Sequence, residues 1–188
     1  LIVNYSKTIA TKENKEPVFS VLISFAFVVF GLTNVLQIIS SISNVTPIVS
    51  LTNFEYSVRY GYMYSLILIL IPFVYHLVPK IYGREFIYGR LETFNAYLLG
   101  TSVVATLSLN TLIGINSGFS WNAGANAGNP TIYGEGFLIT WSLISTPYTF
   151  ILFLSLLFLL STFLFTLSTL KAIIGGSVTE SETVSEIS

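Results

Sequence analysis

The chain has no cysteine, no aspartate and a single histidine, His76, among its 188 residues. Without cysteine there is no disulfide, no thiolate metal ligand and no cysteine nucleophile. Charged residues are scarce: they make up 9% of the chain, against about 25% in soluble domains. With a formal net charge of −1, there is no basic stripe to neutralise the phosphates of DNA or RNA. We therefore exclude nucleic acid as a partner.

Hydrophobic residues are what the sequence has in excess. They account for 53% of the chain, and the mean hydropathy is +0.76. A helix needs about 20 mostly apolar residues to cross a hydrocarbon core of about 30 Å. Four stretches meet this requirement, at residues 17–40, 59–78, 93–115 and 137–170. We expect an all-α membrane protein with four transmembrane helices.

The fourth apolar stretch is longer than a bilayer requires. As one helix, residues 137–170 would extend for about 51 Å at 1.5 Å per residue. Pro147 lies within it and predicts a kink or the end of an interfacial lead-in. Before this stretch, residues 117–135 are rich in glycine and asparagine, and we expect them to form an external loop.

The positions of lysine and arginine predict the orientation in the membrane. Seven of the eight fall on one side of the four spans, and Arg59 falls on the other. By the positive-inside rule both termini are cytoplasmic, in the plasma membrane of the cell. This divides the chain into a polar N-terminus (1–16), a four-helix transmembrane domain (17–174) and a disordered acidic tail (175–188). The seven residues are Lys7, Lys12, Lys15, Lys80, Arg84, Arg90 and Lys171.

Several short motifs occur in an order that is typical of one membrane family. Residues 75–79 read Tyr-His-Leu-Val-Pro, and Gly-Arg-Glu follows at 83–85. Phe-Gly-Leu-Thr-Asn at 30–34 and Glu-Tyr-Ser-Val at 55–58 precede them, and Gly-Ile-Asn-Ser-Gly follows at 114–118. This order resembles the C-terminal four helices of haem–copper terminal oxidase subunit I, in its cbb-type and nitric-oxide-reductase-like branch. The topology predicted from charge is the one that this resemblance implies.

The sequence departs from that family where the resemblance implies haem ligands. The His-x-His positions of the family correspond to Tyr60 and Tyr62, or in another register to Ser57 and Arg59, and Asn-Ala-Tyr at 95–97 replaces a His-Phe-Trp-like triplet. Haem iron takes imidazole, thiolate, thioether or occasionally phenolate ligands. Tyr60 offers a phenolate as an axial ligand, but two haems and a copper cannot be assembled from these residues.

The resemblance without the ligands implies a non-catalytic accessory subunit of a respiratory terminal oxidase, from an archaeal source. It would hold no catalytic, cofactor or metal residue of its own. Its expected partners are the catalytic subunit I, which would carry haem and copper, other membrane subunits, and lipids or quinone. A weaker hypothesis is that the chain is one half of a split catalytic subunit. It is weaker because such a half would carry haem ligands.

Two further functions stay open. One is a quinone-binding subunit, in which Tyr75, His76 and Arg84 would lie at one face of the bilayer; a structural role for His76 at the membrane interface is the alternative. The other is a stand-alone transporter, which would need polar groups along a path within the spans. The amides inside the spans are expected instead to hydrogen-bond to neighbouring helices. They are Asn34, Gln37 and Asn110.

Two local patterns predict packing. Glu55 and Arg59 are spaced for an ion pair on one helix face. Ser102, Ala105 and Ser108, with Gly100 nearby, predict a small-residue face on which another helix packs closely.

Overall fold

The computed structural model describes residues 17–50, 52–82, 90–126 and 130–175. Apart from short turns, these residues form helices: α2 (Pro17–Ser40), a short α3 (Thr46–Val49), α4 (Asn53–Ile81), α5 (Arg90–Asn126) and α6 (Pro130–Gly175). The four long helices each contain a segment long and apolar enough to cross a membrane. The prediction of four spanning helices is confirmed to that extent, and the chain has the architecture of a multi-pass membrane protein.

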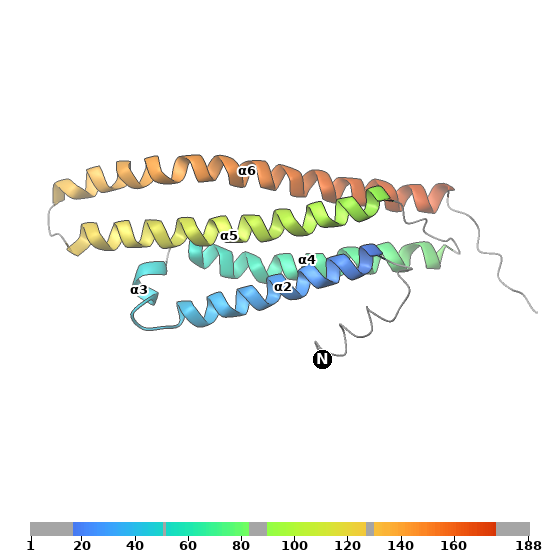
Figure 1. Ribbon diagram of the computed structural model, residues 1–188, viewed down its shortest axis with the longest axis horizontal. Coiled ribbons are helices and arrows are strands. Elements are labelled where there is room, and N and C mark those ends of the chain that lie inside the picture. The colour runs from blue at the N-terminus through green and yellow to red at the C-terminus, as the bar shows by residue number, and fades with distance from the viewer. Residues whose placement is uncertain (1–16, 51, 83–89, 127–129, 176–188) are drawn as a thin grey trace, which may run out of the picture.

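The four long helices lie side by side and alternate in direction (Figure 1). The start of α2 and the end of α6 are at the same end of the bundle, and α3 is at the other end. Helix α5 contacts every other helix, whereas α6 packs mainly on α5. An even number of crossings agrees with termini on one side of the membrane. The cytoplasmic assignment of that side stays a prediction.

The prediction of an external loop at residues 117–135 is wrong for the residues that the structure describes, because they are helical. Helix α5 continues to Asn126, and α6 already begins at Pro130, so only 127–129 lie outside the described residues. The turn-forming composition is overridden because helix propensity is weak beside tertiary packing. Proline at the first position of α6 is favourable, since its missing N–H has no helical acceptor there.

The two C-terminal helices are much longer than a bilayer requires. With 37 and 46 residues, α5 and α6 extend for about 55 and 69 Å at 1.5 Å per residue. Helix α6 is continuous through Pro147, so this proline does not end a helix. The predicted terminal segments lie mostly outside the described residues, although helix α6 continues through Gly175.

The core is a narrow apolar seam between the helices. On α5 the buried residues Ala96, Leu99, Val103 and Leu107 recur at steps of three and four, which keeps them on one face of a helix. A second, smaller cluster lies beneath α3 and consists of Val49, Phe54 and Val58. The other members of the main cluster come from α2, α4 and α6: Val18, Leu22, Ala26, Val29, Leu68, Tyr75 and Phe165.

The small-residue face of α5 is only partly as predicted. Gly100 packs against the ring of Phe25, and Ser102 is buried, but Ser108 is exposed. Three-residue steps fall short of a full helical turn, so the row turns away from the neighbouring helix. Close contact continues instead at Gly114, which lies against the backbone of Phe54.

Candidate functional site

Tyr60, one of the two positions that the resemblance pairs with haem-ligating histidines, belongs to a row of aromatic rings on α4. Its ring centroid is 6.0 Å from that of Tyr56, with the planes 19° apart, and 6.4 Å from that of Tyr64. Tyr64 in turn meets Phe158 of α6 edge to face, at 5.6 Å between centroids. Half of the Tyr60 surface is exposed. The row lines α4 and reaches α6.

Tyr62, the other of these two positions, faces α2 instead. Its hydroxyl donates to Oδ1 of Asn34, at 3.3 Å, and its ring meets Phe30 edge to face, with 6.0 Å between centroids. The Asn34 amide also donates to the Phe30 carbonyl at 2.7 Å. Residues two apart on a helix point in nearly opposite directions, so Tyr60 and Tyr62 do not converge on one site.

The amides of Asn34 and Asn110 bind neighbouring helices, as the sequence predicts. Beside the Tyr62–Asn34 contact, Nδ2 of Asn53 on α4 lies 3.5 Å from Oδ1 of Asn110 on α5. The same Asn53 amide donates to the hydroxyl of Tyr148 on α6, at 2.6 Å. Asn53 therefore connects three helices at the α3 end of the bundle, a role that its position before the predicted span did not reveal.

Tyr75 and His76, two of the three residues predicted to lie near a quinone, contact different helices. Tyr75 is 2% exposed and packs edge to face on Phe165 of α6, at 5.3 Å between centroids. His76 is half-buried, and its ring lies 6.1 Å from that of Phe19 on α2. Adjacent helical residues point about 100° apart, which explains the two directions. Arg84 lies outside the described residues, and quinone binding stays a prediction.

Asn95 and Ser161 form a buried polar contact between α5 and α6 that the sequence does not predict. Asn95 is 6% exposed and Ser161 is fully buried. The amide of Asn95 donates to the Ser161 carbonyl, and the Ser161 hydroxyl lies 2.7 Å from Oδ1 of Asn95. Both residues interrupt apolar spans, which is the signal that marks them as interhelical donors and acceptors.

A cavity of about 460 Å³ opens where α2, α3 and α4 meet. The ion pair predicted between Glu55 and Arg59 is confirmed at its rim, with 3.3 Å between Oε1 and Nη2. The cavity depends on α3 folding across the ends of two spans, so no local pattern indicates it. Its lining consists of Gln37, Ser40, Thr46, Val49, Ser50, Phe54, Glu55, Val58, Arg59 and Tyr62.

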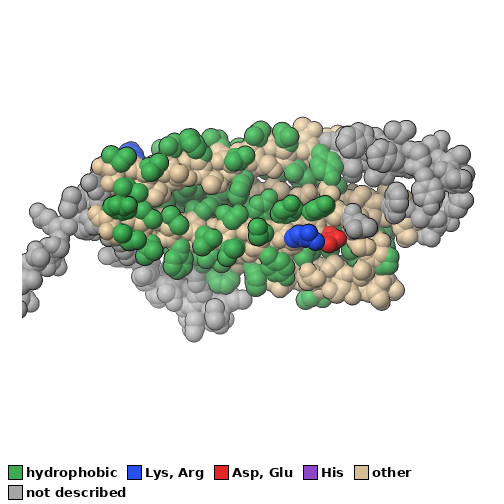
Figure 2. All heavy atoms as spheres, turned by 180° about the vertical axis from the view of Figure 1, so that it is seen from behind, with side chains coloured by type: hydrophobic (Ala, Val, Ile, Leu, Met, Phe, Trp, Pro, Cys, Tyr) green, Lys and Arg blue, Asp and Glu red, His purple; other side chains and the backbone are tan. Residues whose placement is uncertain are grey.

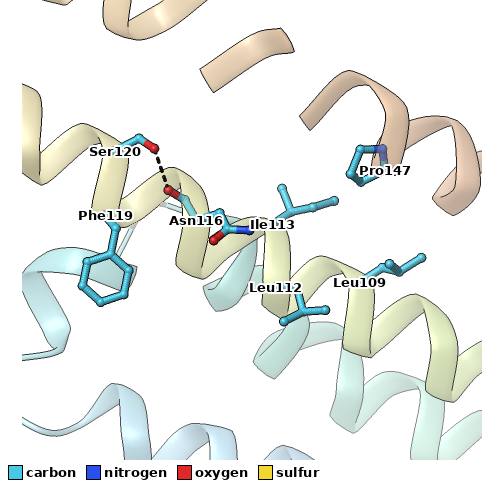
Figure 3. Close-up of a pocket in the computed structure, with 7 residues that line it drawn as sticks. All are labelled: Leu109, Leu112, Ile113, Asn116, Phe119, Ser120 and Pro147. Atoms are coloured by element: carbon cyan, nitrogen blue, oxygen red, sulfur yellow. Dashed lines mark hydrogen bonds between the residues drawn. The ribbon is translucent and has the colours of Figure 1, made fainter. Parts of the chain in front are cut away.

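A second cavity, of about 440 Å³, lies between α5 and α6 beside Pro147 (Figure 3). Its lining is largely apolar, with Asn116 and Ser120 as the polar members. The Ser120 hydroxyl donates to the Asn116 carbonyl of its own helix at 2.9 Å. Such a lining suits an alkyl chain better than a polar substrate. Its apolar residues are Leu109, Leu112, Ile113, Phe119 and Pro147.

Within the described ranges, no three His, Cys, Asp or Glu side chains are grouped so that they could hold a metal ion. Comparison with protein-family models, with curated proteins and with solved structures gives no match for this chain. The fold is that of a multi-pass helical membrane protein, with interhelical polar contacts and open cavities among the described residues.

Proposed function

We propose that this chain is a non-catalytic structural subunit of a membrane complex, and that the complex is a respiratory terminal oxidase. The oxidase part follows from the resemblance of residues 19–118 to the C-terminal helices of subunit I. The structural part is supported by how the chain uses the positions of the family's histidines.

The observation that carries the proposal is the contact made by each tyrosine at those positions. Tyr62 donates to Asn34 on α2, and Tyr60 stacks within the aromatic row that reaches α6. Interhelical hydrogen bonds and ring contacts stabilise a bundle in the membrane. A side chain committed to such contacts serves packing, which is the work expected of a structural subunit.

Helix α6 offers the surface on which a partner would pack. Leucine and phenylalanine predominate among the exposed side chains that the structure describes on this helix, and Figure 2 shows apolar side chains over much of the face opposite to that of Figure 1. Such a surface suits lipid tails and the apolar helices of another subunit equally well. The large hydrophobic residues at least 40% exposed on the described part of this helix are Phe150, Leu152, Phe153, Leu156, Leu159, Leu160, Phe163, Leu164, Leu167, Leu170 and Ile174.

The test is purification of the tagged chain from its native membranes in mild detergent. Subunits that co-purify are identified by mass spectrometry, and a reduced-minus-oxidised spectrum records haem. We expect a constant ratio to a histidine-bearing oxidase subunit, with haem in proportion to that subunit. Haem on the isolated chain would refute the ligand argument. An isolated, colourless chain would refute the oxidase part and favour the transporter.

A matched pair of variants tests the docking face. Leu160 on α6 and Val28 on α2 are both 51% exposed apolar residues within spans. We expect Leu160→Asn to lower the recovery of the catalytic subunit, because an amide at an apolar contact must be desolvated. We expect Val28→Asn to leave the recovery unchanged. Equal recovery with both variants would exclude this face of α6 as the contact.

A further inference from the structure

The cavity between α2, α3 and α4 has an apolar floor and a polar rim. Val49, Phe54 and Val58 are at most 7% exposed and form the floor. Around them the lining supplies an amide, hydroxyls and the Glu55–Arg59 ion pair. This division between apolar and polar surface is that of a site for an amphiphile, with a polar head above an apolar stem.

The position of the cavity along the bundle matches the head-group layer of a bilayer. Helix α2 ends at Ser40, α4 begins at Asn53, and the short α3 lies between them. The ends of spanning helices lie where the hydrocarbon core gives way to lipid head groups. In Figure 2 a basic and an acidic side chain lie next to each other, where the green apolar surface gives way to backbone and side chains of other types near one end of the bundle.

The charges at the rim are balanced and accessible. The side chain of Arg59 is 72% exposed and that of Glu55 is 49% exposed, so both reach beyond their mutual contact. A guanidinium has five N–H donors, and the observed contact to Glu55 uses one nitrogen. The pair therefore offers a cation to an anionic group and a carboxylate to a cationic group of the same ligand.

We propose that this cavity binds the head group of a zwitterionic phospholipid of the phosphoethanolamine type. The phosphate lies beside Arg59 and the ammonium beside Glu55, with Gln37 and Ser40 near the glycerol region. A purely anionic head group would meet the Glu55 carboxylate without compensation. A quinone has no charge to match either residue. The inference is independent of the oxidase proposal, because it rests on the cavity and its charges alone.

The test is native mass spectrometry of the purified full chain, released from detergent micelles after titration with a defined lipid. The probes are palmitoyl-oleoyl phosphatidylethanolamine, the phosphatidylglycerol with the same acyl chains, and decylubiquinone. We expect the wild-type chain to retain the ethanolamine lipid in preference to the glycerol lipid. We expect Arg59→Gln to weaken the binding of the ethanolamine lipid about fivefold, which is the effect of losing one exposed charge pair.

Glu55→Gln is expected to have the opposite effect on the lipid preference. With Arg59 left as a lone cation, the preference should change to the anionic phosphatidylglycerol. Lys171→Gln removes an exposed cation at the other end of the bundle. It should leave the retention of both lipids unchanged. The exchanged pair Glu55→Arg with Arg59→Glu should keep the preference for the ethanolamine lipid, because both charges remain.

Three results would overturn the proposal. They are a wild-type preference for phosphatidylglycerol, unchanged retention of the ethanolamine lipid by Arg59→Gln, and displacement of that lipid by decylubiquinone. If a single variant fails to elute as a folded protein, the head-group preference of the wild-type chain and of the exchanged pair decides between the outcomes.

Discussion

Asn95 on α5 and Ser161 on α6 bind each other through both side chain and backbone. Nδ2 of Asn95 donates to the Ser161 carbonyl at 3.0 Å. The Ser161 hydroxyl lies 2.7 Å from Oδ1 and 3.1 Å from the carbonyl oxygen of Asn95. The shorter distance identifies Oδ1 as its main acceptor. Because apolar side chains slide past one another more easily than paired polar groups, this contact sets the register of α5 on α6.

Replacing either residue should loosen the α5–α6 pair. We expect Asn95→Ala and Ser161→Ala to lower the free energy of unfolding by about 0.6–1.7 kcal/mol each, the range of interhelical hydrogen bonds in membranes. Asn95→Ala should cost more, because it removes the donor to the Ser161 carbonyl as well. Unfolding in mixed micelles on addition of SDS measures both, and the double variant gives the coupling energy.

Ser155→Ala is the control for this pair. Ser155 lies on α6 like Ser161, but it is exposed, and its hydroxyl donates to the Ile151 carbonyl within α6. We expect almost no loss of stability from this change. A Ser161→Ala variant as stable as Ser155→Ala would contradict the role given to the Asn95–Ser161 contact.

Gly114 and Gly118 should not tolerate a methyl group. A Cβ at Gly114 would overlap the backbone nitrogen of Phe54, and one at Gly118 would overlap the carbonyl oxygen of Ile48. Backbone atoms cannot rotate away as a side chain can, so α5 would have to move from α3 and α4. We expect each Gly→Ala change to cost about 1–3 kcal/mol, measured by the same unfolding titration.

Gly31 is the matched control for these glycines. It is also helical, but no atom from a neighbouring segment lies within 4 Å of the position that a Cβ would take there. Alanine at this site should be neutral or stabilise the chain by up to about 1 kcal/mol, because alanine has the higher helix propensity. Equal losses at Gly31 and Gly114 would mean that the close backbone contact is not the cause.

The absence of cysteine makes the orientation directly measurable, since any introduced thiol is the only one in the chain. Ser50 and Lys171 are exposed at opposite ends of the bundle. We expect a membrane-impermeant maleimide to label Ser50→Cys in intact cells, and Lys171→Cys only after lysis. The reverse pattern would invert the orientation predicted from the lysines and arginines. Labelling of both in intact cells would contradict a bundle that crosses the membrane.

His76 tests the quinone alternative. Its ring lies next to Phe19 on α2, while Tyr75 packs on Phe165 of α6. If the chain is a structural subunit, His76→Leu should leave the rate of quinol oxidation by the purified complex unchanged when the subunit content is equal. Tyr75→Phe, which keeps the ring contact, should do the same. A slower rate with His76→Leu alone, in an intact complex, would favour a quinone site at this end of the bundle.

The sequence predicts the spans better than it predicts their ends. The cores of all four helices are apparent because runs of apolar residues without charges fit a membrane and little else. The helical course of residues 117–126 is not apparent, because glycine and asparagine favour turns when considered locally. There, Gly118 lies against α3, and this contact between distant segments favours the helix.

In the candidate sites, too, the sequence predicts local contacts but not contacts between distant segments. The spacing of Glu55 and Arg59 predicts their ion pair, and polar residues inside spans predict interhelical contacts for Asn34 and Asn110. The sequence does not indicate which residue each amide meets, and it does not pair Asn95 with Ser161. A hydrogen-bond partner 66 residues away depends on how two helices are aligned, which no local pattern specifies.

Composition and the order of apolar segments alone determined that this chain is a helical membrane protein with four crossings. The reason is that hydrocarbon tolerates only backbone that satisfies its own hydrogen bonds, and an apolar helix does so within one segment. The tertiary structure alone decided the partners of the buried polar groups, the central place of α5 and the cavity beneath α3. Those features arise where segments distant in sequence meet, and there the shape of both surfaces determines the contact.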